Sequence, residues 1–149
     1  MKIHAVSVVL FAALAGATVF CMPSLLRADA APSAPPAAVV HDLLSRDLNG
    51  AAGKELRMLT VEYVPGGASL AHRHNAQVFV YVLQGSVRMQ VQGSPLVTLG
   101  PGDTFYEGPD DIHTVSANAS ATEPARFLVF TVKDKAAPIS TAAAPEHRP

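Results

Sequence analysis

Hydrophobic and polar residues alternate through the middle of the chain with the two-residue period of a half-buried β-strand. The clearest run is SVRMQVQ, residues 86–92, in which every second position is apolar. Successive side chains of a strand point to opposite faces of the sheet. The run therefore predicts a strand with one face in the core and the other in solvent.

Similar short runs follow one another between Gly/Pro-rich turns, and no stretch has the longer period of an amphipathic helix. Short strands separated by such turns are typical of an all-β sandwich or barrel. Residues 39–44 are open to two interpretations, an edge strand or a single helical turn. The predicted strands are 55–64, 78–83, 86–92, 95–99, 104–106, 113–116 and 126–132.

The first 30 residues differ in character from the rest. A basic start is followed by a long uncharged apolar segment and then by Ala28-Asp29-Ala30. This order predicts a secretory signal peptide cleaved after Ala30, and hence a periplasmic or secreted protein. The alternative is an uncleaved anchor, because the apolar segment 5–26 is long enough to span a bilayer although Pro23 interrupts it.

The remaining chain divides into three parts by composition. Residues 31–38 are Pro/Ala-rich and predict a linker. Residues 136–149 are poor in core-forming side chains and predict a disordered tail. A single folded domain is expected over 39–135.

Charge and cysteine content narrow the classes of partner. The formal net charge is −1 and no basic block occurs, so neither nucleic acid nor, after signal cleavage, a membrane is expected as a partner. Cys21 is the only cysteine, and cleavage after Ala30 would remove it. A mature domain without disulfides must be stabilised by its core, a metal or a partner chain.

Candidate chemistry is concentrated in His72 and His74. Two histidines at i and i+2 on a strand share one face, and imidazole nitrogen binds Zn, Cu, Fe and Ni. His113 opens a later apolar segment after the turn-rich EGPDDI and is the natural third ligand. The alternative for the pair is ordinary hydrogen bonding inside a barrel that binds no metal.

These residues lie in two stretches that resemble the two motifs of the cupins. The first cupin motif has a glycine, five residues, His-x-His, three or four residues, a glutamate, six residues and a glycine. PGGASLAHRHNAQVFVYVLQG matches it at Gly66, His72, His74 and Gly85. GDTFYEGPDDIHTVSAN resembles the second motif, with matches at Gly102, Pro109 and His113, and with Asn118 one residue beyond the usual asparagine.

The resemblance covers roughly residues 40–133 and implies a small single-domain cupin with a double-stranded β-helix, or jelly-roll, barrel. The chain departs from the motif where the glutamate is expected, because Val78 stands there. What the resemblance implies is therefore a three-histidine site, His72, His74 and His113. Gln77 is the nearest polar residue, but strand parity turns it to the opposite face from Val78.

The resemblance implies a divalent first-row metal, with Fe²⁺ the first choice and Mn²⁺, Zn²⁺, Ni²⁺ or Cu²⁺ as alternatives. One functional hypothesis is a dioxygenase-like metalloenzyme acting on a small molecule. A second is a binding module that holds a small ligand or metal without turnover. A homodimer through the sheet faces is compatible with both. Glu107, Asp110 and Asp111 are expected to form a solvated acidic turn, with a proton-handling role for Glu107 as the alternative.

Overall fold

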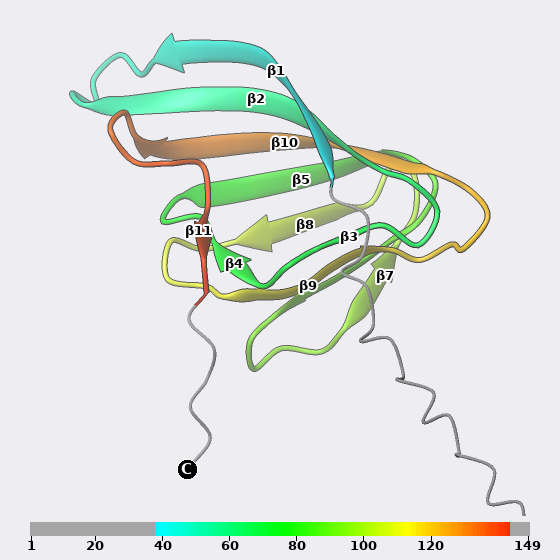
Figure 1. Ribbon diagram of the computed structural model, residues 1–149. Helices are drawn as coiled ribbons and strands as arrows, with labels where there is room; N and C mark the ends of the chain where they lie inside the picture. The colour runs from blue at the N-terminus through cyan, green and yellow to red at the C-terminus, as the bar shows by residue number, and fades with distance from the viewer. Residues whose placement is uncertain (1–37, 144–149) are drawn as a thin grey trace, which may run out of the picture. The chain divides into compact units, whose positions relative to one another are not determined.

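A computed structural model of the chain describes residues 38–143, and all the regular elements in this range are β-strands (Figure 1). The predicted signal peptide and all but the last residue of the predicted linker lie outside the described residues. No helix long and apolar enough to cross a membrane occurs between residues 38 and 143. The strands are β1 (Val39–Asp47), β2 (Lys54–Tyr63), β3 (Ala68–Ser69), β4 (His72–Arg73), β5 (Gln77–Gln84), β6 (Val87–Val91), β7 (Val97–Leu99), β8 (Thr104–Glu107), β9 (His113–Asn118), β10 (Ala125–Asp134) and β11 (Thr141–Ala142).

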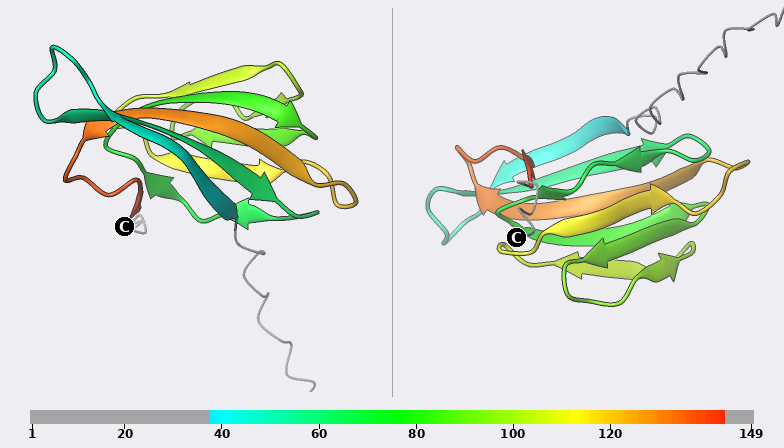
Figure 2. Two further views of the ribbon diagram at one scale, coloured as in Figure 1. Left: turned by 90° about the horizontal axis from the view of Figure 1, so that it is seen from above. Right: turned by 60° about the horizontal axis from the view of Figure 1, so that its bottom comes forward.

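The strands form two antiparallel sheets. One has the order β1-β2-β10-β5-β8, and Figure 1 shows these five strands side by side. The other has the order β11-β4-β9-β6-β7, with β3 also paired to β9. Figure 2 shows the two layers from above and from below. The predicted all-β jelly-roll fold is confirmed.

Residues 39–47 form the edge strand of the first sheet rather than a helical turn. β1 pairs antiparallel with β2 from Val39↔Glu62 to Asp47↔Glu55, with an irregularity between Asp42 and Leu44. The helical alternative is wrong because these backbone groups are engaged in a ladder with β2. The strand is mostly exposed, as expected of a sheet edge.

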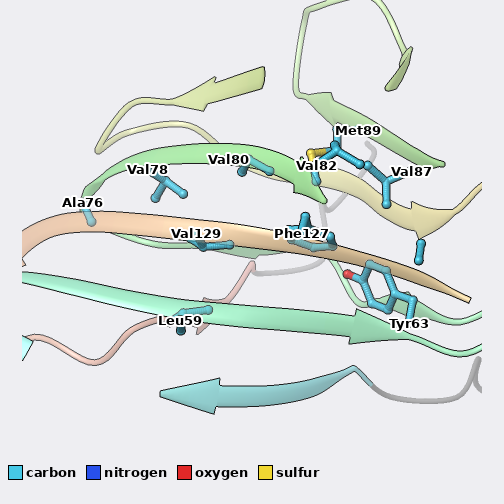
Figure 3. Close-up of a cluster of buried hydrophobic side chains, with 11 residues drawn as sticks. Leu59, Tyr63, Ala76, Val78, Val80, Val82, Val87, Met89, Phe127 and Val129 are labelled. Carbon is cyan, nitrogen blue, oxygen red and sulfur yellow. The ribbon is translucent and has the colours of Figure 1, made fainter. Parts of the chain in front are cut away.

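The core lies between the two sheets and is built by alternation. In β5, Val78, Val80 and Val82 are buried, whereas the intervening residues are exposed. Burying one such valine stabilises the fold by about 1.5–3 kcal/mol. Figure 3 shows these valines with Phe127 and other members of the cluster. The buried hydrophobic cluster consists of Leu59, Tyr63, Ala76, Val78, Val80, Val82, Val87, Met89, Ala125, Phe127 and Val129.

The C-terminal segment is ordered further than its composition suggested. Ile139 packs against the core, and β11 pairs with β4 through Thr141↔Arg73 and Ala142↔His72. The expectation of a disordered tail from residue 136 is therefore wrong for residues 136–143, which we call the C-terminal strap. The physical reason is that β4 offers an open edge and the core offers room for one apolar side chain, and neither feature is visible locally.

A buried lysine fixes the start of this strap. The Lys133 side chain is 1% exposed and its Nζ lies 2.7 Å from Glu55 Oε1. The same ammonium group donates to the main-chain carbonyls of Asp134 and Ala137. A buried cation requires such partners. The hydrogen bonds from the ammonium group of Lys133 therefore hold the turn that leads into the strap.

Candidate metal centre

The structure brings the three predicted histidines together. His72 lies on β4, His74 follows directly after it, and His113 opens β9 as the Cα partner of His72. Each histidine offers a ring nitrogen, and these nitrogens all lie within 4.8 Å of one another. His72 and His74 are close in sequence, and the pairing of β4 with β9 adds His113 to them.

The backbone fixes which nitrogen of His72 and His74 faces the cluster. His72 Nδ1 lies 2.7 Å from the carbonyl oxygen of Leu70, and His74 Nδ1 lies 2.7 Å from that of Ile139. A carbonyl oxygen only accepts, so each Nδ1 must carry the hydrogen and donate it. In the neutral ring, Nε2 is then left with a free lone pair.

The two Nε2 atoms face each other at 3.1 Å. Two lone pairs at this separation repel unless a proton or another cation lies between them. Two nitrogens that bind one metal ion side by side, each at about 2.1 Å, are themselves separated by about 3 Å. The donor set of His72 and His74 therefore fits a shared metal ion.

His113 is a buried histidine whose ring nitrogens are free to bind a metal ion. It is 3% exposed, and Phe105 stacks on its ring with centroids 5.8 Å apart. Neither ring nitrogen makes a hydrogen bond with any residue in the described range. Leaving such groups buried and unpaired costs about 1–3 kcal/mol each, and coordination to a cation would remove that cost.

A carboxylate that the sequence analysis placed in a solvated turn completes the cluster. Glu107 is 2% exposed, with Oε1 3.1 Å from His113 Nδ1 and Oε2 3.9 Å from His74 Nε2. The Nδ1–Oε1 pair has the length of a hydrogen bond but not its direction. The expectation of a solvated Glu107 is wrong because β8 extends through residue 107 and turns this side chain inward.

Strand register explains how the carboxylate reaches the site without a glutamate at position 78. Glu107 of β8 is the direct partner of Val78 on β5. Directly opposed residues project to the same face of a sheet, about 5 Å apart. Glu107 lies two residues after Phe105, which is half-buried, so strand alternation in the sequence already indicated that both side chains point inward. The sequence did not indicate that β8 pairs with β5.

Gln77 does not take part in the cluster. It is exposed on the opposite face of β5 from the buried Val78, as strand parity predicted. The neighbouring acidic residue Asp111 accepts a hydrogen bond from the Gly108 amide at 2.7 Å and so serves the turn instead. Among the described residues near the histidines, Glu107 is the carboxylate in contact with them.

Burial and mutual charge set the protonation states at the site. Burial favours the uncharged form of Glu107, but contact with His113 and the charges of His113, His74 and His72 outweigh it and lower the pKa of the carboxyl group. Burial also lowers the pKa of His72, assisted by the neighbouring histidines. An ionised carboxylate and a neutral imidazole are the forms that bind metal.

The cluster lies in the wall of a cavity of about 520 Å³ between the sheets. Its volume is in the range of small-molecule sites. Most of the lining is apolar, including Val80, Phe127 and Val129. A small molecule in this cavity would therefore have direct access to the histidines and Glu107.

Comparison with known proteins identifies the family. The sequence profile of the cupin domain matches residues 59–131, a range that contains all three histidines and Glu107. Many solved cupin structures also share the fold. The chain carries a cupin domain and belongs to the cupin superfamily.

Three solved structures illustrate the likeness. The DMSP lyase DddQ from Ruegeria pomeroyi DSS-3 has a TM-score of 0.59 and 21% identity, over 74% of this chain and 54% of the lyase. A putative mannose-6-phosphate isomerase from Ralstonia eutropha JMP134 has a TM-score of 0.54 and 22% identity, over 72% of this chain and 94% of the other. A cupin-like protein from Thermotoga maritima MSB8 has a TM-score of 0.57 and 20% identity, over 72% and 76%.

These similarities establish the fold and leave the reaction open. The match to the lyase spans about half the length of that protein. No curated protein matches the chain in sequence. At identities near 20% the shared architecture hosts unrelated activities, so function must be argued from the site.

Proposed function

We propose that this protein is an exported metallocupin that binds one divalent first-row metal ion through His72, His74, His113 and Glu107, and that it acts on a small molecule in the adjoining cavity. Fe²⁺ is the first choice of metal, with Mn²⁺, Zn²⁺, Ni²⁺ or Cu²⁺ as alternatives. A mixed imidazole and carboxylate donor set suits several of these ions.

One observation carries the proposal. His72 and His74 both donate Nδ1–H to main-chain carbonyls, and their Nε2 atoms face each other at 3.1 Å. A neutral pair in this geometry has two opposed lone pairs and no bond between them. A cation bound by both nitrogens turns that repulsion into two favourable contacts.

The four groups divide the work of the site. The bound metal would act as a Lewis acid toward an oxygen function of the substrate. Glu107 contributes the negative charge that three neutral imidazoles lack, and its lowered pKa keeps it ionised. Oε1 of Glu107, beside His113, would be available as an acceptor for a proton from the substrate.

A metal-dependent oxidoreductase of the dioxygenase type is the reaction class we favour, because a histidine-rich site beside an apolar cavity suits activation of a small organic molecule. The named structural relatives are a lyase and a putative isomerase, so the comparison with them does not favour one reaction class. Turnover of a substrate by the metal-loaded protein would establish the class.

A binding module without turnover is the second candidate. Val78 and Val80 make the wall beside the histidines apolar, which favours retention of a ligand over chemistry on a polar group. The two candidates differ in one respect: a module releases its ligand unchanged. Mass spectrometry of the ligand after release from aerobic, metal-loaded protein distinguishes them.

The proposal of export is supported by the order of residues 1–30, and a protein cleaved after Ala30 would be periplasmic or secreted. A mature chain that begins at Ala31 in the periplasmic or secreted fraction supports it. Retention of residues 1–30 on a membrane-bound protein would favour the anchor instead.

Metal content tests the proposal directly. The purified chain is stripped with chelator and titrated with Fe²⁺ without oxygen and with Zn²⁺, and bound metal is measured per chain. We expect one equivalent, lost in His72→Ala and His113→Ala and retained in His41→Ala, which changes an exposed histidine on β1. Binding of less than a tenth of an equivalent of Fe²⁺ and also of Zn²⁺ would refute the proposal.

A further inference from the structure

The cavity beside the metal centre has a second polar pole. The Tyr63 hydroxyl lies 2.7 Å from Ser69 Oγ and 2.8 Å from Ser116 Oγ. All three residues line the cavity. We call this group the hydroxyl cluster.

The hydroxyl cluster has one hydrogen to spare. Three hydroxyl groups carry three hydrogens, and the two bonds inside the cluster use two of them. Tyr63 is 1% exposed, and burial is the main reason that its pKa is raised. It therefore stays neutral, and the cluster offers a ligand one neutral hydrogen-bond donor.

The two poles lie at different points along β9 in the lining of the same cavity. Ser116 follows His113 by three residues along β9, which corresponds to about 10 Å. The rest of the lining is mostly apolar and comes from both sheets, with Leu59 and Val80 from one sheet and Met89 from the other (Figure 3). A ligand that reaches both poles must cross this apolar section.

The charge of the lining restricts the ligand further. The cavity is lined by no lysine or arginine from the described residues, and its charged groups are those of the candidate metal centre. An anionic group away from the metal, whether a phosphate or a second carboxylate, would be buried there without a cationic partner, which is costly. A sugar would leave several hydroxyl groups against apolar side chains.

From these features we infer that the cavity takes a compact, mostly apolar organic molecule with one metal-binding oxygen head group and at most a neutral hydrogen-bond acceptor at its far end. This inference rests on the proposed metal site, since the head group binds there. It excludes sugar phosphates and dicarboxylates as substrates.

Matched probes test the inference on the zinc-loaded protein. Acetohydroxamate and benzohydroxamate carry the same metal-binding head and differ in the apolar body, whereas glucose 6-phosphate joins a phosphate to a body of hydroxyl groups. By calorimetry we expect benzohydroxamate to bind at least 10-fold more tightly than acetohydroxamate, because its ring buries apolar surface. Glucose 6-phosphate should show no binding at millimolar concentration.

A cavity-filling variant locates the body of the probe. Val61 of β2 lines the cavity and is only partly buried, so Val61→Phe should reduce benzohydroxamate affinity at least 5-fold and leave acetohydroxamate and zinc binding unchanged. Thr60→Phe is the matched control, because the neighbouring residue is not part of the lining.

The outcomes separate the two claims. Equal affinity of the two hydroxamates for wild-type protein, or binding of glucose 6-phosphate as tight as that of benzohydroxamate, overturns this inference and leaves the metal site standing. Failure of zinc to bind overturns both. The wild-type ratio decides the matter even if Val61→Phe does not fold.

Discussion

Val78 and Glu107 are direct partners across β5 and β8, and both are buried. In the cupin motif that this chain resembles, a glutamate occupies the position of Val78. Here the carboxylate stands on the neighbouring strand instead and contacts His113 and His74. The site therefore has one buried carboxylate, as the cupin motif does, but β8 supplies it instead of β5.

This arrangement predicts that metal binding requires one carboxylate, which either β5 or β8 can supply. Glu107→Val should lower metal affinity at least about 10-fold, because losing a ligand should cost no less than the 10- to 100-fold typical of losing an outer-shell partner. The double variant Val78→Glu with Glu107→Val should recover at least part of that loss. Metal titration of the wild type and the two variants checks this.

The single variant Val78→Glu serves as the control for the exchange. It buries two carboxylates side by side, so we expect a lower midpoint of thermal unfolding than in the double variant. Unchanged metal affinity in Glu107→Val would show that Glu107 has no part in the site.

The C-terminal strap predicts a dependence of the metal site on a segment far away in sequence. Ending the chain after Lys135 removes Ile139, whose carbonyl holds Nδ1 of His74, and β11, which pairs with His72. We expect metal affinity to fall at least 10-fold, because the His74 ring loses the acceptor that orients it and the strand that carries His72 loses its partner. Isothermal titration measures the effect.

A chain that ends after Ala143 is the matched control, because it keeps every described contact of the strap. It should bind metal as the full chain does. Equal affinities for both truncated chains would mean that the strap does not orient the histidines.

The Lys133–Glu55 pair predicts a large loss of stability on removal of one charge. Lys133→Met leaves Glu55, which is 14% exposed, without its cation and frees the carbonyls of Asp134 and Ala137. Because Lys133 itself is buried, removing its charge should lower the free energy of unfolding more than removing an exposed charge does. Urea unfolding at neutral pH measures the change in the free energy of unfolding.

Lys54→Met tests whether burial is the cause. Lys54 pairs with Asp134 at 2.8 Å, but both side chains are exposed, so the expected loss is about 1 kcal/mol or less. Similar losses in the two variants would contradict the role assigned to burial.

The lowered pKa of His72 predicts that the metal-free protein becomes less stable on acidification. Below the usual value of 6.5 the unfolded chain takes up a proton at this residue before the folded chain does. The free energy of unfolding should therefore fall as the pH drops from 6.5 to the lowered folded pKa. Glu107, whose pKa is also lowered, should add a second loss as the pH falls below its usual 4.5.

Chemical unfolding of metal-free protein at pH 7.5, 6.5 and 5.5 checks the first of these losses. His72→Gln should show a shallower decline over this interval, because it removes the group that titrates. His41→Gln, at an exposed position, is the control and should follow the wild type. An equally steep decline in His72→Gln would assign the effect to other groups.

Local pattern was sufficient to predict most of the strands and an all-β sandwich or barrel, and the resemblance to the cupin motifs added the jelly-roll class and the set of three histidines. Alternation in residues 86–92 depends only on neighbours along the chain, and so does the pairing of His72 and His74 on one side. The edge strand β1 was left undecided because a mostly exposed strand has little hydrophobic periodicity to distinguish it from a turn.

The tertiary structure alone decided three matters: the partner of Val78, the order of the C-terminal strap and the nitrogen that His74 presents. Each depends on a contact between residues far apart in sequence, such as Val78 with Glu107 or His74 with the Ile139 carbonyl. Strand register and the filling of an open sheet edge are set by the whole fold, and a one-residue shift would turn Glu107 away from the site. The sequence by itself thus determined which residues could form the centre, and the strand register determined that a carboxylate joins them.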